Sequence, residues 1–291
     1  MRIPKNSPPN LGGEFLLCLT LFLVACGRPA DVAPRPGPPQ RIISVVPSAT
    51  EMLFAFGLGD KVVAVGDYDR FPPEVETKPR IGGLINPNIE KIIELKPDLV
   101  ITYGTQDVLR ERLASVGVRF HPFVHGNAEH TIRYIEELGK VVGAENRALE
   151  IASEIRNTFD DIRARTPAKR PKVLLVHNRG AGVLGSFYTV GSKAFQHELI
   201  EIAGGENLFG EIERETLQPS VEEIIKRSPD IIIETLSPPM DDAHVKQRKA
   251  DWKQLGFSEN RVFILGETYY LVPGPRLHLA ARGLAELIQG R

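Results

Sequence analysis

The sequence contains one motif twice, and this internal repeat restricts the fold more than any other feature. Residues 88–101 (NIEKIIELKPDLVI) match residues 220–233 (SVEEIIKRSPDIII) at a constant offset. Each copy begins with a residue that favours helix N-termini, continues as a short helix, turns at Pro-Asp and ends in the apolar run of a buried strand. Two copies of one helix–turn–strand unit predict two halves of related topology.

The rest of the chain from residue 41 onward alternates between short apolar runs and helical stretches, which predicts an α/β fold with mostly parallel sheets. Pro47 is expected to end the first strand, and Ser48 with Glu51 has the spacing of a capping box that opens a helix. The strands are predicted at 41–46, 61–65, 99–103, 119–124, 172–177, 231–234 and 261–265.

A long helical stretch separates the two halves. Residues 127–165 carry Glu, Arg, Ile and Leu at helical spacing without a strand candidate, and they predict two helices that meet near Gly143. We therefore expect two Rossmann-like lobes joined by one long backbone helix. The predicted boundaries are 41–143 for the first lobe, 144–170 for the linking helix and turn, and 171–291 for the second lobe.

The N-terminus has the pattern of an export signal. Residues 15–25 carry no charge, and they are too few to span a bilayer as a mature helix. They lead to Leu-Val-Ala-Cys-Gly at 23–27, which resembles a bacterial lipobox with Cys26 as the lipidated residue. We expect residues 1–26 to be a lipoprotein signal peptide and 27–40, which are rich in proline, to be a tether. The alternative is a plain signal peptide that contains a chance cysteine.

Charge and cysteine content exclude several classes of function. The chain has 36 Lys and Arg residues against 37 Asp and Glu residues, so it lacks the basic excess of nucleic-acid-binding proteins. Its two cysteines, Cys18 and Cys26, both precede the globular part. A disulfide, a cysteine nucleophile and a cysteine metal site are therefore excluded from the fold.

Several short motifs occur in a fixed order from residue 41 onward: RIIS at 41–44 with PSATE at 47–51, NIE at 88–90 with KPDLVI at 96–101, GGENLF at 204–209 and SPD at 228–230. With these motifs the chain resembles the bacterial periplasmic binding proteins for cobalamin and ferric siderophores, and sometimes haem.

 In that family a single chain holds a bulky ligand in the cleft between its lobes and delivers it to an ABC importer.

The resemblance also sets expectations for the ligand and its surroundings. The ligand would be a corrinoid such as cobalamin, a ferric siderophore or haem. Any cobalt or iron would belong to this transported ligand, and we expect no resident cofactor. The chain would act as a monomer on the periplasmic side of the cell envelope, with the ABC importer permease as its protein partner and a lipid anchor in the membrane.

Two glutamates would contact the importer. In the cobalamin-binding members one glutamate on each lobe docks onto arginines of the permease, and those positions correspond here to Glu90 and Glu222. Both belong to the internal repeat, which places them at equivalent positions of the two halves. The alternative is that each is an ordinary acid in the first turn of a helix, where the helix dipole favours negative charge.

Ligands of open α/β sheets lie beyond the carboxyl ends of the strands, and aromatic residues and arginines follow those ends here. Arginines would suit an anionic ferric chelate, and Tyr103 or Tyr269 could ligate haem iron. Leu84 and Thr216 stand where the cobalamin-binding members carry tryptophans, a departure that weakens the match to cobalamin itself. The alternative for each aromatic is an ordinary half-buried ring at a strand end. The predicted ligand-binding residues are Tyr68, Phe71, Leu84, Tyr103, Arg179, Tyr188, Tyr269, Tyr270 and Arg276.

Other classes of function fit the sequence less well. The sequence contains no Gly-x-Ser-x-Gly, Walker or His-Glu-x-x-His motif, so we do not expect an enzyme. A zinc or manganese receptor of an ABC importer is the main alternative, because His121, His125 and His130 are close in sequence. A purely structural envelope lipoprotein is a further possibility, and it would bind no ligand.

Overall fold

The computed structural model describes residues 37–104, 106–177, 179, 185, 187–236 and 241–290. The predicted signal peptide, Cys26 and most of the tether lie outside the described residues. Within the described residues, no helix has both the length and the apolar character needed to cross a membrane.

The first sheet is entirely parallel and has the strand order β2-β1-β3-β4. Its strands agree with the predicted ones to within two residues at each end, because most of them are short apolar runs bounded by proline, glycine or polar residues. The strands are β1 (Ile42–Ser44), β2 (Val62–Val65), β3 (Leu99–Tyr103) and β4 (Arg119–Phe123). The helical elements that connect them are α1 (Pro47–Ala55), η1 (Gly59–Lys61), η2 (Pro73–Thr77), α2 (Ile89–Glu94) and α3 (Asp107–Ser115).

The second sheet has the order β10-β9-β5-β6-β8, with β7 beside the start of β5. The strands β10, β9 and β5 are parallel, whereas β6 and β8 are antiparallel additions that the sequence did not predict. The strands are β5 (Lys172–His177), β6 (Tyr188–Val190), β7 (Glu206–Asn207), β8 (Thr216–Leu217), β9 (Ile231–Thr235) and β10 (Val262–Leu265). The helical elements are α6 (Phe195–Ile202), α7 (Val221–Arg227), α8 (Asp242–Gln254), η3 (Glu259–Arg261), η4 (Thr268–Tyr270) and α9 (Leu277–Gln289).

The internal repeat corresponds to α2–β3 in one sheet and α7–β9 in the other. Asn88 caps α2 by accepting a hydrogen bond from the Lys91 backbone N–H, and Ser220 caps α7 by accepting one from the Glu223 N–H. Each strand then lies between two parallel partners, so that β1-β3-β4 and β5-β9-β10 share one order. The prediction of two topologically related halves is confirmed.

The Pro-Asp turn of the repeat has a structural function that explains why both copies contain it. The Asp98 carboxylate accepts a hydrogen bond of 3.0 Å from the backbone N–H of Arg41, where β1 begins. In the second sheet the Asp230 carboxylate accepts one of 2.9 Å from the backbone N–H of Lys172, where β5 begins. Each aspartate therefore fixes the start of the neighbouring strand and satisfies a backbone donor that the ladder leaves free.

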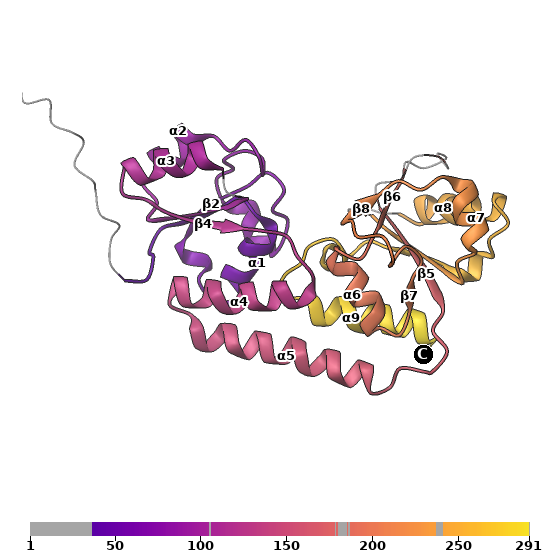
Figure 1. Cartoon of the computed structure of the whole chain (residues 1–291). Helices are drawn as coiled ribbons and strands as arrows, with labels where there is room; N and C mark the ends of the chain where they lie inside the picture. Colours follow the sequence, from indigo (N-terminus) through magenta and orange to yellow (C-terminus); the bar gives the residue numbers. More distant parts are fainter. Residues whose placement is uncertain are drawn as a thin grey trace, which may run out of the picture. The chain divides into compact units, whose positions relative to one another are not determined.

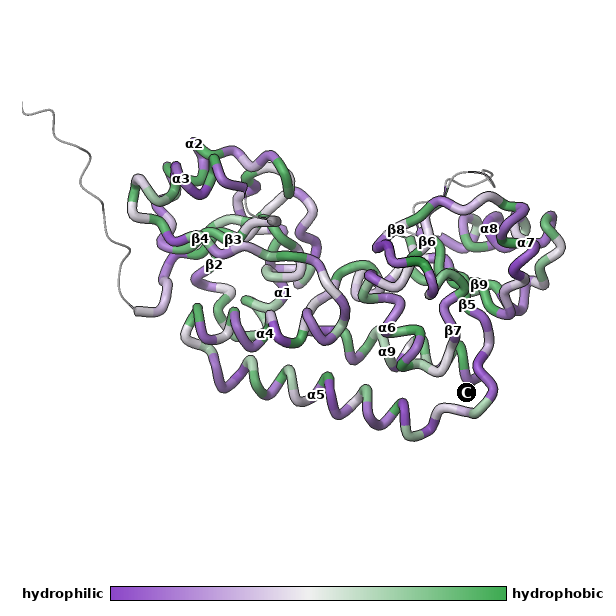
Figure 2. Tube along the Cα trace, in the orientation of Figure 1, coloured by the Kyte–Doolittle hydropathy of each residue, from purple (hydrophilic) through white to green (hydrophobic). Residues whose placement is uncertain are grey.

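The long helical stretch forms α4 (Ala128–Val142) and α5 (Glu145–Arg163), which run side by side (Figure 1). They meet at Gly143, whose φ of 74° closes α4 in the left-handed conformation that glycine adopts most readily. Hydrophobic and hydrophilic residues alternate along α5 (Figure 2), and its buried face contacts α9. The predicted fold class, two α/β lobes joined by one long helix, is confirmed.

Strand β5 shows how the second sheet is covered on both faces. Val173 and Leu175 point into the large core that includes residues of α4, α5 and α9. Leu174 and Val176 point the other way, into a smaller core around Trp252. A strand that is buried on both faces reads as a continuous apolar run, which is why this one was recognisable in the sequence.

The predicted capping box at the start of α1 is wrong. The helix begins earlier, at Pro47, and its N-cap residue Val46 makes no side-chain capping bond. Proline suits the first turn of a helix because its missing N–H would have had no partner there. Ser48 and Glu51 therefore lie inside the helix and are buried, and Glu51 is available for a distant partner.

Candidate functional site

Aromatic residues gather where the strands of the first sheet end. Strand β2 leads into the loop 66–71, which exposes Tyr68 and Phe71 by 61% and 37%. Tyr103 ends β3 half-buried, and its ring lies edge-on to His125, which follows β4, at 5.0 Å between centroids. Because β2, β3 and β4 are parallel, these side chains come from the same edge of the sheet, as predicted.

The other predicted aromatic and apolar positions divide into accessible and buried ones. Tyr188 is 38% exposed on β6, and Tyr269 is partly buried in η4. Leu84 packs partly against the core, and its carbonyl accepts a hydrogen bond from the Gln106 side chain at 2.8 Å. All three keep some accessible surface.

Tyr270 differs from its neighbour and corrects a prediction. It is only 5% exposed, and its hydroxyl lies against Gly283 of α9, where a side chain would collide with it. Burial raises the pKa of the Tyr270 hydroxyl, with a smaller contribution from Tyr269. Successive residues of a 3₁₀ turn point in different directions, so two adjacent tyrosines that look alike in the sequence have different surroundings. Tyr270 belongs to the core.

Arg276 joins the two lobes through an ion pair. Its guanidinium binds both carboxylate oxygens of Glu51 in α1, at 2.9 Å from Nε and 2.5 Å from Nη2, and donates to the Thr268 hydroxyl at 2.8 Å. The same group stacks on the Phe71 ring at 3.7 Å from its centroid. Arg276 is thus engaged by protein groups, and its predicted role as a free anion-binding residue is not supported by its contacts.

Further polar contacts link the first lobe to the second. The Nδ1 atom of His125 lies 2.9 Å from the carboxylate of Glu215. The carboxylate of Glu198 in α6 accepts hydrogen bonds from the backbone N–H groups of Ala128 and Glu129, at 2.8 and 3.3 Å. These are the first N–H groups of α4, which have no partner within the helix, so the second lobe adds to the cap that Asn127 makes with the His130 N–H.

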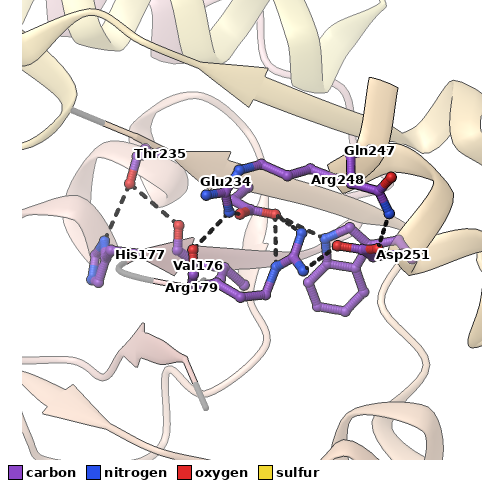
Figure 3. Close-up of polar contacts among 9 residues, drawn as sticks. Val176, His177, Arg179, Glu234, Thr235, Gln247, Arg248 and Asp251 are labelled. Atoms are coloured by element: carbon purple, nitrogen blue, oxygen red, sulfur yellow. Dashed lines mark hydrogen bonds and ion pairs between the residues drawn. The ribbon is translucent and has the colours of Figure 1, made fainter. Parts of the chain in front are cut away.

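Arg179 is the clearest correction among the predicted ligand-binding residues. Its side chain is fully buried and binds Glu234 at 2.9 Å and Asp251 at 2.8 Å (Figure 3). Arg248 forms a second ion pair with Glu234, and the Trp252 indole donates to the same carboxylate at 3.0 Å. The Arg179 guanidinium is therefore occupied by two buried carboxylates and presents no exposed surface to a ligand.

His177, the residue that ends β5, has a defined protonation state. His177 is half-buried, and its Nδ1 atom lies 3.3 Å from the Thr235 hydroxyl at the end of β9 (Figure 3). Burial lowers the pKa of His177 to about 4, so this side chain is neutral at neutral pH.

The loop 66–71 contains a buried carboxyl that binds the backbone of the same loop. Asp69 has no exposed surface, and its Oδ2 atom accepts a hydrogen bond from the Gly66 N–H at 2.9 Å. Burial raises the pKa of Asp69 to about 7, against smaller opposing effects of Thr50, Gly66 and Arg80. Asp69 was not among the predicted site residues, because an aspartate between polar neighbours in a loop is usually solvated.

The predicted docking glutamates occupy equivalent places. Glu90 and Glu222 are exposed and lie in the first turns of α2 and α7. Backbone hydrogen bonding at the helix start, followed by the Ser220 side chain, lowers the pKa of Glu222. Glu223 differs, because its carboxylate binds Arg227 at 3.0 Å.

The three histidines that suggested a metal site have separate surroundings and do not share one site. His121 is buried in β4, His125 binds Glu215, and the ring of His130 contacts the carbonyl of Val124. Across the part of the chain that the structure describes, no group of three His, Cys, Asp or Glu residues could hold a metal ion.

Comparisons with known proteins agree with this geometry. A family model described as periplasmic binding protein matches residues 42–268. A vitamin B12-binding protein of Photorhabdus laumondii is 28% identical over 279 residues, which cover 94% of this chain and 95% of that protein. An uncharacterised ABC transporter substrate-binding lipoprotein of Bacillus subtilis is 27% identical, with coverage of 94% and 95%. The crystal structure of a periplasmic vitamin B12-binding protein of Vibrio cholerae superposes with a TM-score of 0.71 at 25% identity, covering 87% of this chain and 98% of that one.

Proposed function

The chain belongs to the periplasmic binding protein family, and we propose that it captures a corrinoid such as cobalamin between its lobes and delivers it to an ABC importer. The main support for this proposal is the set of accessible aromatic rings at the strand ends of the first sheet, Tyr68, Phe71 and Tyr103. Flat, amphipathic rings suit a large ligand with an apolar face and a polar rim.

The state of the arginines favours a corrinoid over an anionic ferric siderophore. Both predicted anion-binding arginines are engaged, Arg179 by Glu234 and Arg276 by Glu51. An anionic chelate would have to displace one of these carboxylates, whereas a ligand held by aromatic contacts requires no such exchange. Haem is the second candidate, because Tyr103 and Tyr269 keep some accessible surface and a tyrosinate can ligate its iron.

Delivery would use the two exposed glutamates. Glu90 and Glu222 start equivalent helices of the two lobes, so a permease could bind both with one repeated arrangement of arginines. Cys26 would carry the lipid anchor, and the protein would act as a monomer on the periplasmic side of the membrane. It would need no resident cofactor, since the metal would travel within the ligand.

A binding panel tests the choice of ligand. Residues 27–291 contain every described residue and are titrated calorimetrically with cyanocobalamin, haem and ferric hydroxamate siderophores. We expect cyanocobalamin to bind one-to-one with a Kd in the micromolar range or below. Tight binding of haem alone would replace the corrinoid by the second candidate, and binding of none of them by folded protein would contradict the proposal.

Charge reversal tests the docking surface separately. Glu90→Arg combined with Glu222→Arg should abolish ligand uptake in cells but leave the Kd for ligand unchanged. The matched control reverses Glu94 and Glu213, two exposed acids of the same lobes, and should transport normally. Normal uptake by the Glu90 and Glu222 double variant would show that the importer does not read these glutamates.

A further inference from the structure

Asp69 belongs to the loop 66–71, which also carries two of the accessible aromatic residues. Its neighbours Tyr68 and Arg70 are exposed, whereas its own side chain turns inward and has no exposed surface. The hydrogen bond from the Gly66 N–H to Oδ2 closes the loop from the inside. This carboxyl is therefore one of the contacts that hold the loop 66–71, together with the bonds from Arg80 to the loop carbonyls.

The surroundings of the Asp69 carboxyl can also accommodate its neutral form, because the Thr50 side chain lowers the pKa of Asp69 but burial raises it more strongly. Its second oxygen, Oδ1, is buried without a hydrogen-bond partner, and so is the hydroxyl oxygen of Thr50 in α1, a side chain that interacts with Asp69. A proton on Oδ1 could be donated to the Thr50 hydroxyl, which would satisfy both atoms.

The charged groups near Asp69 favour its ionised form less strongly than burial disfavours it. Arg80 donates to the backbone carbonyls of Gly66 and Asp69, at 2.8 and 2.7 Å, rather than to the carboxylate. Glu51 adds a like charge from α1, although Arg276 balances it. An ionised Asp69 would therefore be a buried charge without a direct cationic partner, held by the Gly66 N–H and the Thr50 hydroxyl, and it would gain from moving outward into water.

We propose that Asp69 is a positioning residue whose neutral form holds the loop 66–71 in the shape that binds ligand, so that ligand affinity falls when Asp69 loses its proton. The inference rests on the proposed function, because it requires Tyr68 and Phe71 to contact the ligand. Outward movement of Asp69 would shift both residues and would separate Phe71 from Arg276, on which it stacks.

The pH dependence of ligand binding tests the inference. Burial raises the pKa of Asp69 to about 7. If only the neutral form binds, the Kd for cyanocobalamin should be about thirtyfold higher at about pH 8.5 than at about pH 5.5, because only the competent fraction of the protein binds. Asp69→Asn keeps the shape of the neutral acid and can donate to Thr50, so its Kd should stay constant over this range.

A matched control removes an exposed carboxylate of the same lobe. Asp60→Asn should keep the pH dependence of the unmodified protein. A Kd of the unmodified protein that changes less than twofold over this range would overturn the inference. So would an equal pH dependence in Asp69→Asn.

A ligand-free measurement separates this inference from the proposed function. The thermal midpoint of the unliganded protein should fall between about pH 5.5 and pH 8.5, and the fall should be much smaller in Asp69→Asn. If cyanocobalamin binds to none of the variants at any pH while this difference appears, the role of neutral Asp69 in holding the loop is supported and the corrinoid proposal fails. If the thermal midpoints of the unmodified protein and of Asp69→Asn change equally with pH, the proposed role of Asp69 is overturned whether or not ligand binds.

Discussion

Replacement of Arg276 by methionine tests the contact that joins the two lobes. The substitution keeps most of the apolar stem but removes the guanidinium that binds Glu51 and stacks on Phe71. Glu51 would be left as a carboxylate with 3% of its side chain exposed. Loss of one partner from a buried ion pair costs about 3–5 kcal/mol, because the remaining charge is uncompensated.

Protonation of Glu51 limits this loss of stability, and the loss therefore depends on pH. Burial raises the pKa of Glu51 in the intact protein, and Arg276 opposes that effect. Without the arginine the pKa should rise further. A carboxyl with a raised pKa in the folded state is best tolerated at low pH, and its contribution to stability is lost as pH rises. We therefore expect a loss of about 3 kcal/mol at neutral pH and a smaller loss near pH 5.

Denaturant unfolding of a double-mutant cycle measures the interaction. The variants are Arg276→Met, Glu51→Gln and both together, each unfolded at about pH 5 and pH 7. We expect the double variant to be more stable at neutral pH than Arg276→Met alone, with a coupling energy of about 2 kcal/mol or more. A loss below about 1 kcal/mol for Arg276→Met, equal at both pH values, would refute the argument.

Three further predictions concern stability. Arg179→Met should lower the free energy of unfolding by about 3–5 kcal/mol in denaturant titrations, because it leaves Glu234 buried with too few partners; a loss below about 1 kcal/mol would contradict the buried network. Gly283→Ala should lower it by about 1–3 kcal/mol, because the added methyl meets the Tyr270 hydroxyl; an unchanged thermal midpoint would show that the ring moves at little cost. The Asp69 carboxyl, with a pKa raised from 3.8 to about 7, should make the protein less stable by up to about 4 kcal/mol above neutral pH than near pH 4, a difference that Asp69→Asn should remove.

The fold was predictable because its signals are local. Strands β3 and β9 follow a cap, a short helix and a Pro-Asp turn, and each of these depends on residues within a few positions of one another. The break between α4 and α5 at Gly143 was predictable for the same reason. The start of α1 was misplaced because Pro47 can either end a strand or begin a helix, and local pattern does not separate the two.

The buried charges could not be predicted, because their partners are distant in the sequence. Glu51 and Arg276 come from α1 and from the start of α9. Helix α8 looks solvated in sequence, yet Arg248, Asp251 and Trp252 are buried on it. One signal was present: the glutamate at position 234 lies within the apolar strand β9, and a carboxylate in a buried strand requires a cationic partner.

Binding of cyanocobalamin to an aromatic double variant tests the central claim most directly. Tyr68→Ala combined with Tyr103→Ala removes two accessible rings at the strand ends of the first sheet, and Val108→Ala, an exposed apolar residue on α3, is the control. The account predicts micromolar or tighter binding by the unmodified protein and the control, and at least tenfold weaker binding by the double variant at an unchanged thermal midpoint. Equal affinity of all three proteins would contradict the claim that these rings form the ligand site.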